Sequence, residues 1–277
     1  MASLTSSLVA AAKRHHIRLL GVPKETAWSI VSLGERMGQE VYVKVLSPQS
    51  DERLAPALLD AWCTGPVARV LEARDSVHIL ERVNPGTSLG VDYDRLGDDE
   101  SLVVLGTIAS SLRKLGATDI GFPDARARGQ SLLVRSRPAC VDEGLWEKAI
   151  QRYADLADSQ RGVGVVHGDL HHGNVLLDDA RGWVVIDPKG VVAELEFEMA
   201  CALRNPIARV DQWATASQLD KRVRSLARTL GLSEVRLLEW SFAQSVLAAA
   251  WEVEDKLDPA PWVAVARAYD AQLSARL

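Results

Sequence analysis

The chain has 277 residues, enough for one large domain or two closely packed lobes, and its 47% apolar and 25% charged residues are typical of a globular protein. The net charge of -5 argues against a nucleic-acid partner and is compatible with a cationic small-molecule partner. No apolar run reaches the ~18 residues of a membrane-spanning helix, so we expect a cytoplasmic protein without a membrane partner. Three widely separated cysteines indicate reduced thiols rather than disulfides, and nothing indicates an oligomeric state.

The first part of the chain predicts mainly strands and turns. Residues 17–22 form a short apolar run that we expect Pro23 to stop, and residues 28–33 and 40–46 predict a hairpin across a glycine-containing turn. In the second hairpin strand, the period of two places Lys44 on the face opposite three valines. These patterns indicate a small sheet near the N-terminus.

Further along the chain, the prediction changes from strands to helices. Residues 50–62 predict a helix, and the Asn-Pro-Gly-Thr-Ser segment at residues 84–88 predicts a turn that serves as a linker. We therefore expect an α+β protein with a two-lobed fold, in which residues 1–83 form a small β-rich lobe and residues 84–277 form a larger helical lobe. The remaining predicted strands are residues 68–72, 77–83, 165–166, 175–177 and 183–186, and the remaining long helices are residues 101–115, 145–158 and 237–257.

Polar residues that can carry chemistry follow two short apolar segments. The first segment leads into His-Gly-Asp-Leu-His-His-Gly-Asn, which contains Asp169 and Asn174, and the second leads into Asp187. Phosphoryl transfer needs a carboxylate that orients the attacking hydroxyl and accepts its proton, and it needs oxygen ligands for Mg²⁺. Asp169, Asn174 and Asp187 supply one base and two such ligands, with the Asp-to-Asn spacing of the kinase pattern H-R-D-x-x-x-x-N.

The motif H-G-D-L-H-x-G-N followed by I-D-P resembles the aminoglycoside phosphotransferase superfamily, antibiotic kinases that are distantly related to protein kinases. The branch that contains streptomycin 6-phosphotransferases and hydroxyurea-resistance kinases is the one that the chain resembles in residues 80–89, 187–190, 196–200, 203–206 and 240–251. The resemblance implies a protein-kinase-like fold, with ATP and Mg²⁺ as cofactors. It also implies that Asp169 is the catalytic base and that Asn174 and Asp187 bind the metal ion.

The resemblance also implies where the nucleotide binds. Lys44 matches the strand lysine that contacts the α- and β-phosphates, and this lysine should pair with a helix carboxylate. Glu52 is the preferred partner, although it follows Lys44 by only eight residues, and Asp51 and Asp60 are alternatives.

Two further segments should contact the nucleotide. The backbone between Glu81 and Val83 matches the hinge that binds adenine. The loop over residues 23–29 lies where a phosphate-covering loop is expected but contains no glycine, so its backbone amides together with Thr26 or Ser29 would have to contact the phosphates.

The acceptor is predicted from acidic residues near the C-terminus. Glu252 and Asp255 are spaced i, i+3 on one helix face and are our candidates for binding a substrate cation next to Asp169, with Trp251 beside them. The alternative for each residue is an ordinary helix surface or core position.

Other residues of the motif have roles that the sequence leaves open. Lys189 is either a phosphate contact or a surface charge, and His171 or His172 is expected to approach a phosphate. Glu198 stands where the family usually has an aspartate, and we expect it to support the loop that carries Asp169.

Three functions are consistent with these residues. The first is an ATP-dependent kinase that phosphorylates a hydroxyl of a streptomycin-type aminoglycoside and so confers antibiotic resistance. The second is a metabolic kinase of an amino sugar or another small alcohol. The third is a catalytically silent binding protein with a kinase fold, against which the intact Lys44, Asp169, Asn174 and Asp187 argue.

Overall fold

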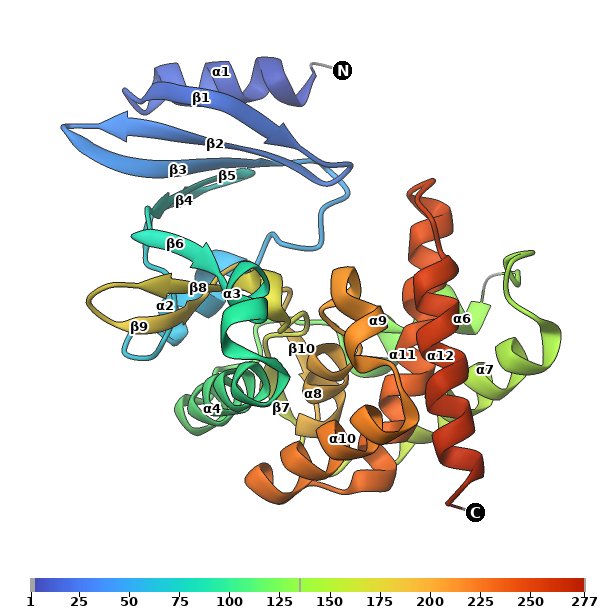
Figure 1. The fold of residues 1–277 in the computed structure, drawn as a ribbon. Coiled ribbons are helices and arrows are strands. Elements are labelled where there is room, and N and C mark those ends of the chain that lie inside the picture. Colours follow the sequence, from blue (N-terminus) through green and yellow to red (C-terminus); the bar gives the residue numbers. More distant parts are fainter. Residues whose placement is uncertain (1–2, 135, 277) are drawn as a thin grey trace.

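The computed structural model describes residues 3–134 and 136–276 and shows a small lobe with a sheet next to a larger helical lobe (Figure 1). The small lobe contains an antiparallel five-stranded sheet of order β1-β2-β3-β5-β4, with α1 packed across it. Its elements are α1 (Leu4–Arg14), β1 (Arg18–Glu25), β2 (Ser29–Arg36), β3 (Gln39–Leu46), β4 (Val70–Arg74) and β5 (Val77–Glu81).

The predicted hairpin is confirmed, because β2 and β3 pair in continuous antiparallel register. Val41, Val43 and Val45 pack in the core under α1, so Lys44 lies on the opposite face of the sheet, as its alternation predicts. The expectation that Pro23 ends the first strand is wrong. β1 continues through Pro23 because β1 is an edge strand of the sheet. Its register with β2 also shifts between Leu20 and Lys24, so the missing N–H of Pro23 is tolerated there.

The helix predicted over residues 50–62 is shorter in the structure. α2 spans Ala55–Ala61 and carries Pro56 in its first turn, a position where proline is tolerated. The residues before it form a loop, in which Glu52 N–H donates to Ser50 Oγ at 3.3 Å. The side chains of α2 pack in the large core of the helical lobe, so the chain visits the larger lobe before it returns to complete the sheet.

The linker predicted over residues 84–88 contains a strand, β6 (Pro85–Ser88), which pairs with β8 (Val175–Asp178). This pairing joins segments about ninety residues apart, so local sequence does not indicate it. On its other edge β8 pairs with β9 (Gly182–Val185), which completes a three-stranded sheet of order β6-β8-β9. A separate two-stranded sheet pairs β7 (Gly164–Val166) with β10 (Val191–Ala193). In Figure 1, β6, β8 and β9 lie just below the five-stranded sheet, and β7 and β10 lie deeper among the helices of the larger lobe.

Helix α11 (Glu234–Glu254) forms the centre of the helical lobe. Thirteen of its residues, between Leu237 and Ala250, are buried, and the helix packs against α7, α8 and α12. Among the described residues, no helix is long and apolar enough to cross a membrane. The other helices of this lobe are α3 (Leu89–Leu96), α4 (Asp98–Leu115), α5 (Ala125–Arg128), α6 (Gln130–Val134), α7 (Glu143–Asp158), η1 (His172–Asn174), α8 (Leu195–Leu203), η2 (Ile207–Arg209), α9 (Val210–Trp213), α10 (Ala216–Leu230) and α12 (Ala260–Ser274).

Candidate active site

The loop between β7 and β8, residues 167–174, carries the central aspartate. Its second residue is Gly168, whose φ of +80° suits glycine and where a Cβ would clash with Val191. Glu198 on α8 lies behind the loop and accepts hydrogen bonds from Gly168 N–H at 2.8 Å and from Leu170 N–H at 3.1 Å. Glu198 therefore supports the loop on both sides of Asp169, as we expected from the sequence.

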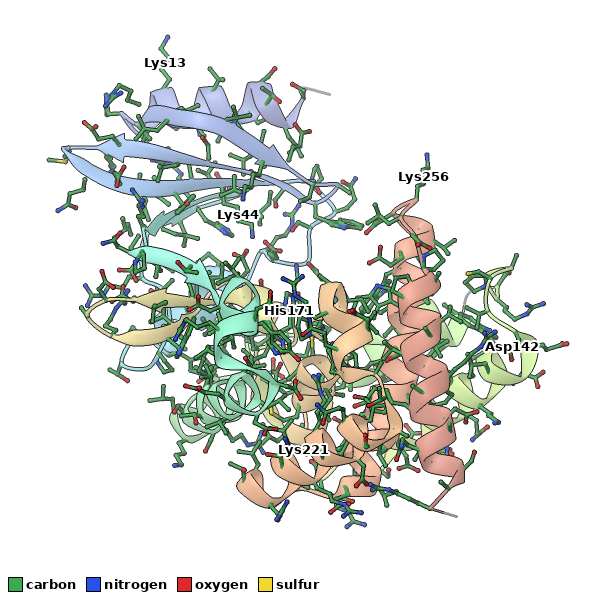
Figure 2. The ribbon with its side chains drawn as sticks, viewed as in Figure 1. Lys13, Lys44, Asp142, His171, Lys221 and Lys256 are labelled. Carbon is green, nitrogen blue, oxygen red and sulfur yellow. The ribbon has the colours of Figure 1, made fainter. Side chains whose placement is uncertain are left out.

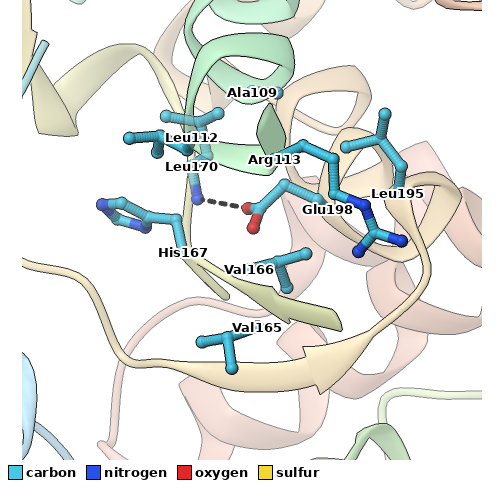
Figure 3. A pocket seen from close by; sticks show the side chains of 9 residues that line it. All are labelled: Ala109, Leu112, Arg113, Val165, Val166, His167, Leu170, Leu195 and Glu198. Carbon is cyan, nitrogen blue, oxygen red and sulfur yellow. Dashed lines mark hydrogen bonds between the residues drawn. The ribbon is translucent and has the colours of Figure 1, made fainter. Parts of the chain in front are cut away.

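A small cavity of about 10 Å³ lies beside Glu198, next to Arg113 on α4 (Figure 3). This volume is about that of one water molecule. Burial raises the pKa of Glu198 from 4.5 to about 7, although its hydrogen bonds from Gly168 and Leu170 act in the opposite direction. The support behind the loop is thus a carboxyl group that titrates near neutral pH.

Three side chains surround the carboxylate of Asp169. Asn174 Nδ2 donates to the Asp169 backbone oxygen at 2.9 Å and lies 3.4 Å from Oδ2. Cys201 Sγ contacts Oδ1 at 3.5 Å, and His171 Nε2 lies 3.8 Å from Oδ2. The other nitrogen of His171 accepts from Gly173 N–H at 3.0 Å, which fixes the orientation of the ring.

The charges around Asp169 keep it ionised. Burial alone would raise its pKa, but His171, Lys189, Arg204 and Arg128 together outweigh burial and hold the pKa below 3.8. A carboxylate in this state can accept a hydrogen bond from a hydroxyl group.

His167 connects this loop to the segment that carries Asp187. Its Nε2 donates to Ile186 O at 2.9 Å, while its Nδ1 accepts from Asp169 N–H at 3.2 Å. Burial lowers the pKa of His167 to about 4, so the ring is neutral and can make one donor and one acceptor contact at the same time. His172, by contrast, is buried and packs edge-on against Tyr93, so of the two histidines expected to approach a phosphate only His171 lines the cavity beside Asp169 in the described part of the chain.

Asp187 lies above the Asp169 loop, next to Asn174. Ile186 N–H donates to Asn174 O at 2.9 Å, which keeps the two segments together, and Asp187 itself has a φ of +55°. Its carboxylate faces the ammonium group of Lys44 at 2.9 Å. Asp187 and the side-chain oxygen of Asn174 are oxygen donors of the kind that Mg²⁺ prefers, and Asp187 already faces a cation. The residues therefore fit a hard divalent cation.

Lys44 of β3 also forms an ion pair with Glu52, so the preferred partner is confirmed. The pair forms despite the short sequence spacing because Glu52 lies in the loop before α2, directly below the sheet, rather than on a helix. Figure 2 shows Lys44 on the sheet side and His171 on the helical side of the space between the two lobes. Asp51 pairs instead with Arg128 at 2.5 Å and with Lys189 at 3.1 Å.

The loop between β1 and β2 has much of its hydrogen-bonding capacity used internally. Thr26 Oγ1 accepts from Trp28 N–H at 3.2 Å and from Ser29 N–H at 3.1 Å, and Thr26 N–H donates to Ser29 O at 2.8 Å. Ser29 is buried at the start of β2. Thr26 therefore stabilises the turn itself, and the amides of Trp28 and Ser29 are engaged within the loop.

The predicted hinge lies at the edge of a small apolar cluster between the lobes. Val83 is buried against Ala68 and Val184, with Ile186 packed beside them. The Glu81 carboxylate points away from this cluster, because it accepts from Arg69 N–H at 2.8 Å and pairs with Arg181 at 2.6 Å. The Glu81 side chain is thus engaged elsewhere, and the backbone of the segment lies beside the apolar cluster.

A cavity of about 520 Å³ opens beside Asp169. The predicted residues Trp251, Glu252 and Asp255 line it at the end of α11, and the Glu252 carboxylate accepts from Trp262 Nε1 at 3.1 Å. The other side chains that line this cavity come from both lobes: Trp28, Gln49, Asp51, Arg128, Asp169, His171, Lys189, Arg204, Asn205, Ile207, Ala248, Glu254 and Trp262.

Sequence reasoning missed several of these residues. Trp28 belongs to the β1–β2 loop and is 41% exposed, and the signal that could have found it is an aromatic residue within the predicted phosphate-covering loop of residues 23–29. Arg128 lies over the Trp251 ring at 4.8 Å, and Arg204 lies over the Trp262 ring at 5.0 Å. These arginines come from α5 and from the end of α8, and their place beside Asp169 depends on the tertiary fold.

The two-lobed fold and the Lys44–Glu52 pair above the Asp169 loop define a kinase-like class of protein. The structure is similar to that of a thermostable mutant of an aminoglycoside phosphotransferase, solved with ADP and hygromycin B, with a TM-score of 0.67, 15% identity and 98% of each chain covered. This similarity confirms the predicted fold.

The sequence matches the aminoglycoside/hydroxyurea antibiotic resistance kinase family over residues 14–256, and the chain belongs to this family. It is 29% identical to a hydroxyurea phosphotransferase from Kitasatospora aureofaciens over 79% of this chain, and it spans 64% of that relative's length. It is 28% identical to a streptomycin 6-kinase from Streptomyces griseus over 86% of this chain and 78% of the relative. The predicted branch is confirmed.

Proposed function

We propose that this protein transfers the γ-phosphoryl group of ATP to a hydroxyl group of an aminoglycoside of the streptomycin type. The observation that carries the proposal is the cavity beside Asp169, which we assign to the acceptor and call the acceptor cavity. The ionised Asp169 lines it, together with the carboxylates of Glu252 and Asp255 at the end of α11. Its volume of about 520 Å³ lies within the range of pockets for drug-sized ligands. More carboxylates than cationic side chains line it, and the carbonyl end of a helix adds negative potential.

The cation-binding role of Glu252 and Asp255 follows from this arrangement. Aminoglycosides carry ammonium or guanidinium groups, and charge-assisted hydrogen bonds to carboxylates orient such groups well. Trp251 contributes an apolar wall, with one ring face covered by Arg128. A cationic sugar held here would present a hydroxyl group toward Asp169.

The nucleotide would bind between the lobes. The adenine ring fits the apolar cluster that contains Val83, where the backbone between Glu81 and Val83 supplies hydrogen-bonding groups. Lys44, held by Glu52, would contact the phosphates. Thr26 would act by holding the β1–β2 turn together rather than as a direct phosphate ligand, and Ser29 by starting β2 at that turn. Because ATP is the donor, we expect the enzyme to act in the cytoplasm.

Asn174 and Asp187 would hold Mg²⁺, which supplies charge neutralisation on the phosphates when it is bound. Asp169 orients the acceptor hydroxyl and takes its proton. The hydroxyl oxygen forms a bond to the γ-phosphorus while the bond from phosphorus to the β–γ bridging oxygen breaks, and ADP leaves with that electron pair. Positioning and electrostatic stabilisation provide most of the rate enhancement in such a reaction.

An ATP-consumption screen tests this proposal. The purified protein is incubated with ATP and Mg²⁺ and with streptomycin, other aminoglycosides, simple amino sugars or hydroxyurea, and the products are analysed by mass spectrometry. We expect phosphorylated streptomycin to form fastest. Turnover on amino sugars alone would favour a metabolic kinase, and nucleotide binding without consumption on any acceptor would favour a silent binding protein.

A further inference from the structure

Lys189 is fixed at its backbone against the loop that carries Asp169. Its N–H donates to His167 O at 2.9 Å, and Gly190 N–H donates to the same oxygen at 2.9 Å. Its Cβ would lie 3.5 Å from a Cβ placed on Gly168. The backbone of Lys189 thus lies next to both residues that precede Asp169.

The ammonium group of Lys189 is held from the other side by the loop before α2. It pairs with Asp51 at 3.1 Å and with Glu52, and only 15% of the side chain is exposed, so Lys189 is not a surface charge. Glu52 uses its Oε1 for Lys189 and its Oε2 for Lys44. One buried carboxylate therefore positions two ammonium groups.

The two lysines lie on different sides of the proposed reaction. Lys44 contacts Asp187, the proposed metal ligand, and so belongs to the nucleotide side. Lys189 lines the acceptor cavity together with Asp169. During transfer, the phosphoryl group carries negative charge away from the nucleotide side and toward the Asp169 carboxylate, which repels it. A cation on the acceptor side offsets this repulsion.

The other two cations of the cavity are guanidinium groups that lie over tryptophan rings. Arg128 lies over Trp251 and pairs with Asp51, and Arg204 lies over Trp262 and contacts Cys201 Sγ at 3.4 Å. An ammonium group has three N–H donors. Within the described part of the chain, Lys189 pairs with two carboxylates, which leaves one donor for a ligand in the cavity.

We propose that Lys189 is a further catalytic residue, which donates a hydrogen bond to the γ-phosphoryl group as it moves from ADP to the acceptor oxygen. This inference rests on the proposed function. Lys189 takes no proton and forms no covalent bond: the hydroxyl proton goes to Asp169, and the electron pair of the broken P–O bond leaves on ADP.

The test compares Lys189→Met and Lys189→Arg with Lys221→Met, which removes an exposed, ion-paired lysine at the far end of the helical lobe (Figure 2). For each, kcat, the KM of the acceptor, the Kd of ATP and the thermal unfolding midpoint are measured. We expect Lys189→Met to lower kcat about 100-fold with the Kd of ATP changed less than about threefold, as for the loss of one transition-state donor. Lys189→Arg should retain about a tenth of kcat, and Lys221→Met should match the wild type.

If Lys189 only holds the two lobes together, Lys189→Met should lower the thermal unfolding midpoint or weaken ATP binding without lowering kcat. The proposal is overturned if Lys189→Met keeps kcat within about threefold of the wild type and changes only the KM or the Kd of ATP. Failure of the wild type to phosphorylate any acceptor is a failure of the proposed function instead. In that case the same variants are compared in the hydrolysis of ATP by water, where the same group is transferred and the same fall in rate is expected.

Discussion

The substitution Glu52→Gln removes one negative charge from between two ammonium groups and keeps the shape of the side chain. Lys44, Glu52 and Lys189 have side chains that are 7%, 9% and 15% exposed, so these ion pairs are buried rather than surface pairs. Removing one partner from a buried pair costs about 3–5 kcal/mol, because the remaining charge loses its compensation. Lys44 keeps Asp187 and Lys189 keeps Asp51, so we expect the lower end, about 3 kcal/mol in the free energy of unfolding.

The matched control is Glu35→Gln, which removes the partner of Arg18 on the outer part of the same sheet. The side chains of that pair are 68% and 38% exposed, and such a surface pair contributes less than ~1 kcal/mol. Urea unfolding at pH 7 measures both variants by linear extrapolation, and the Kd of ATP is measured alongside, where only Glu52→Gln should weaken binding. If the two variants differ in unfolding free energy by less than about 1 kcal/mol, the buried charge cluster does not stabilise the protein as described.

Two further predictions concern the support behind the Asp169 loop and the wall of the acceptor cavity. Because the folded-state pKa of Glu198 is raised from 4.5 to about 7, its contribution to stability is fully present below pH 4.5 and is lost as the pH rises through 7. The unfolding free energy of the wild type relative to Glu198→Gln, measured by urea unfolding, should therefore fall by about 3 kcal/mol as the pH rises from 4.5 to 7. A difference between the two proteins that does not change with pH would refute the raised pKa of Glu198. Trp28→Ala should raise the KM of the acceptor about tenfold and leave the KM of ATP nearly unchanged, since this side chain lines the acceptor cavity. Val22→Ala, at a 91% exposed position on the preceding strand, should change neither KM in steady-state kinetics, and a shift in the KM of ATP alone for Trp28→Ala would contradict its placement.

Much of the site could be predicted because its residues are close in sequence. Asp169 and Asn174 lie in one short loop, and Asn174 is brought to Asp187 by strands that local apolar runs predict. The alternation in β3 correctly placed Lys44 on the face away from the valine core.

The remaining features depend on contacts between distant segments. Strand β6 forms only because β8 offers it an edge, and α2 begins late because the residues before it are held by side chains such as Ser50 and Lys44. Cys201 and Arg204 reach Asp169 from α8 and its end, without a sequence pattern that marks them. The division of the chain at residue 83 stays a prediction, since part of the first segment packs in the larger core.

The substitution Asp169→Asn tests the central claim most directly. Asparagine has nearly the same shape but cannot accept the hydroxyl proton, so turnover of ATP with the acceptor should fall at least ~1000-fold. The Kd of ATP, measured on the same preparation by calorimetry, should stay within about threefold of the wild-type value, because Lys44, Glu52 and Asp187 are unchanged. Phosphorylation of the acceptor by this variant at a rate near that of the wild type would contradict the assignment of Asp169 as the group that orients and deprotonates the hydroxyl.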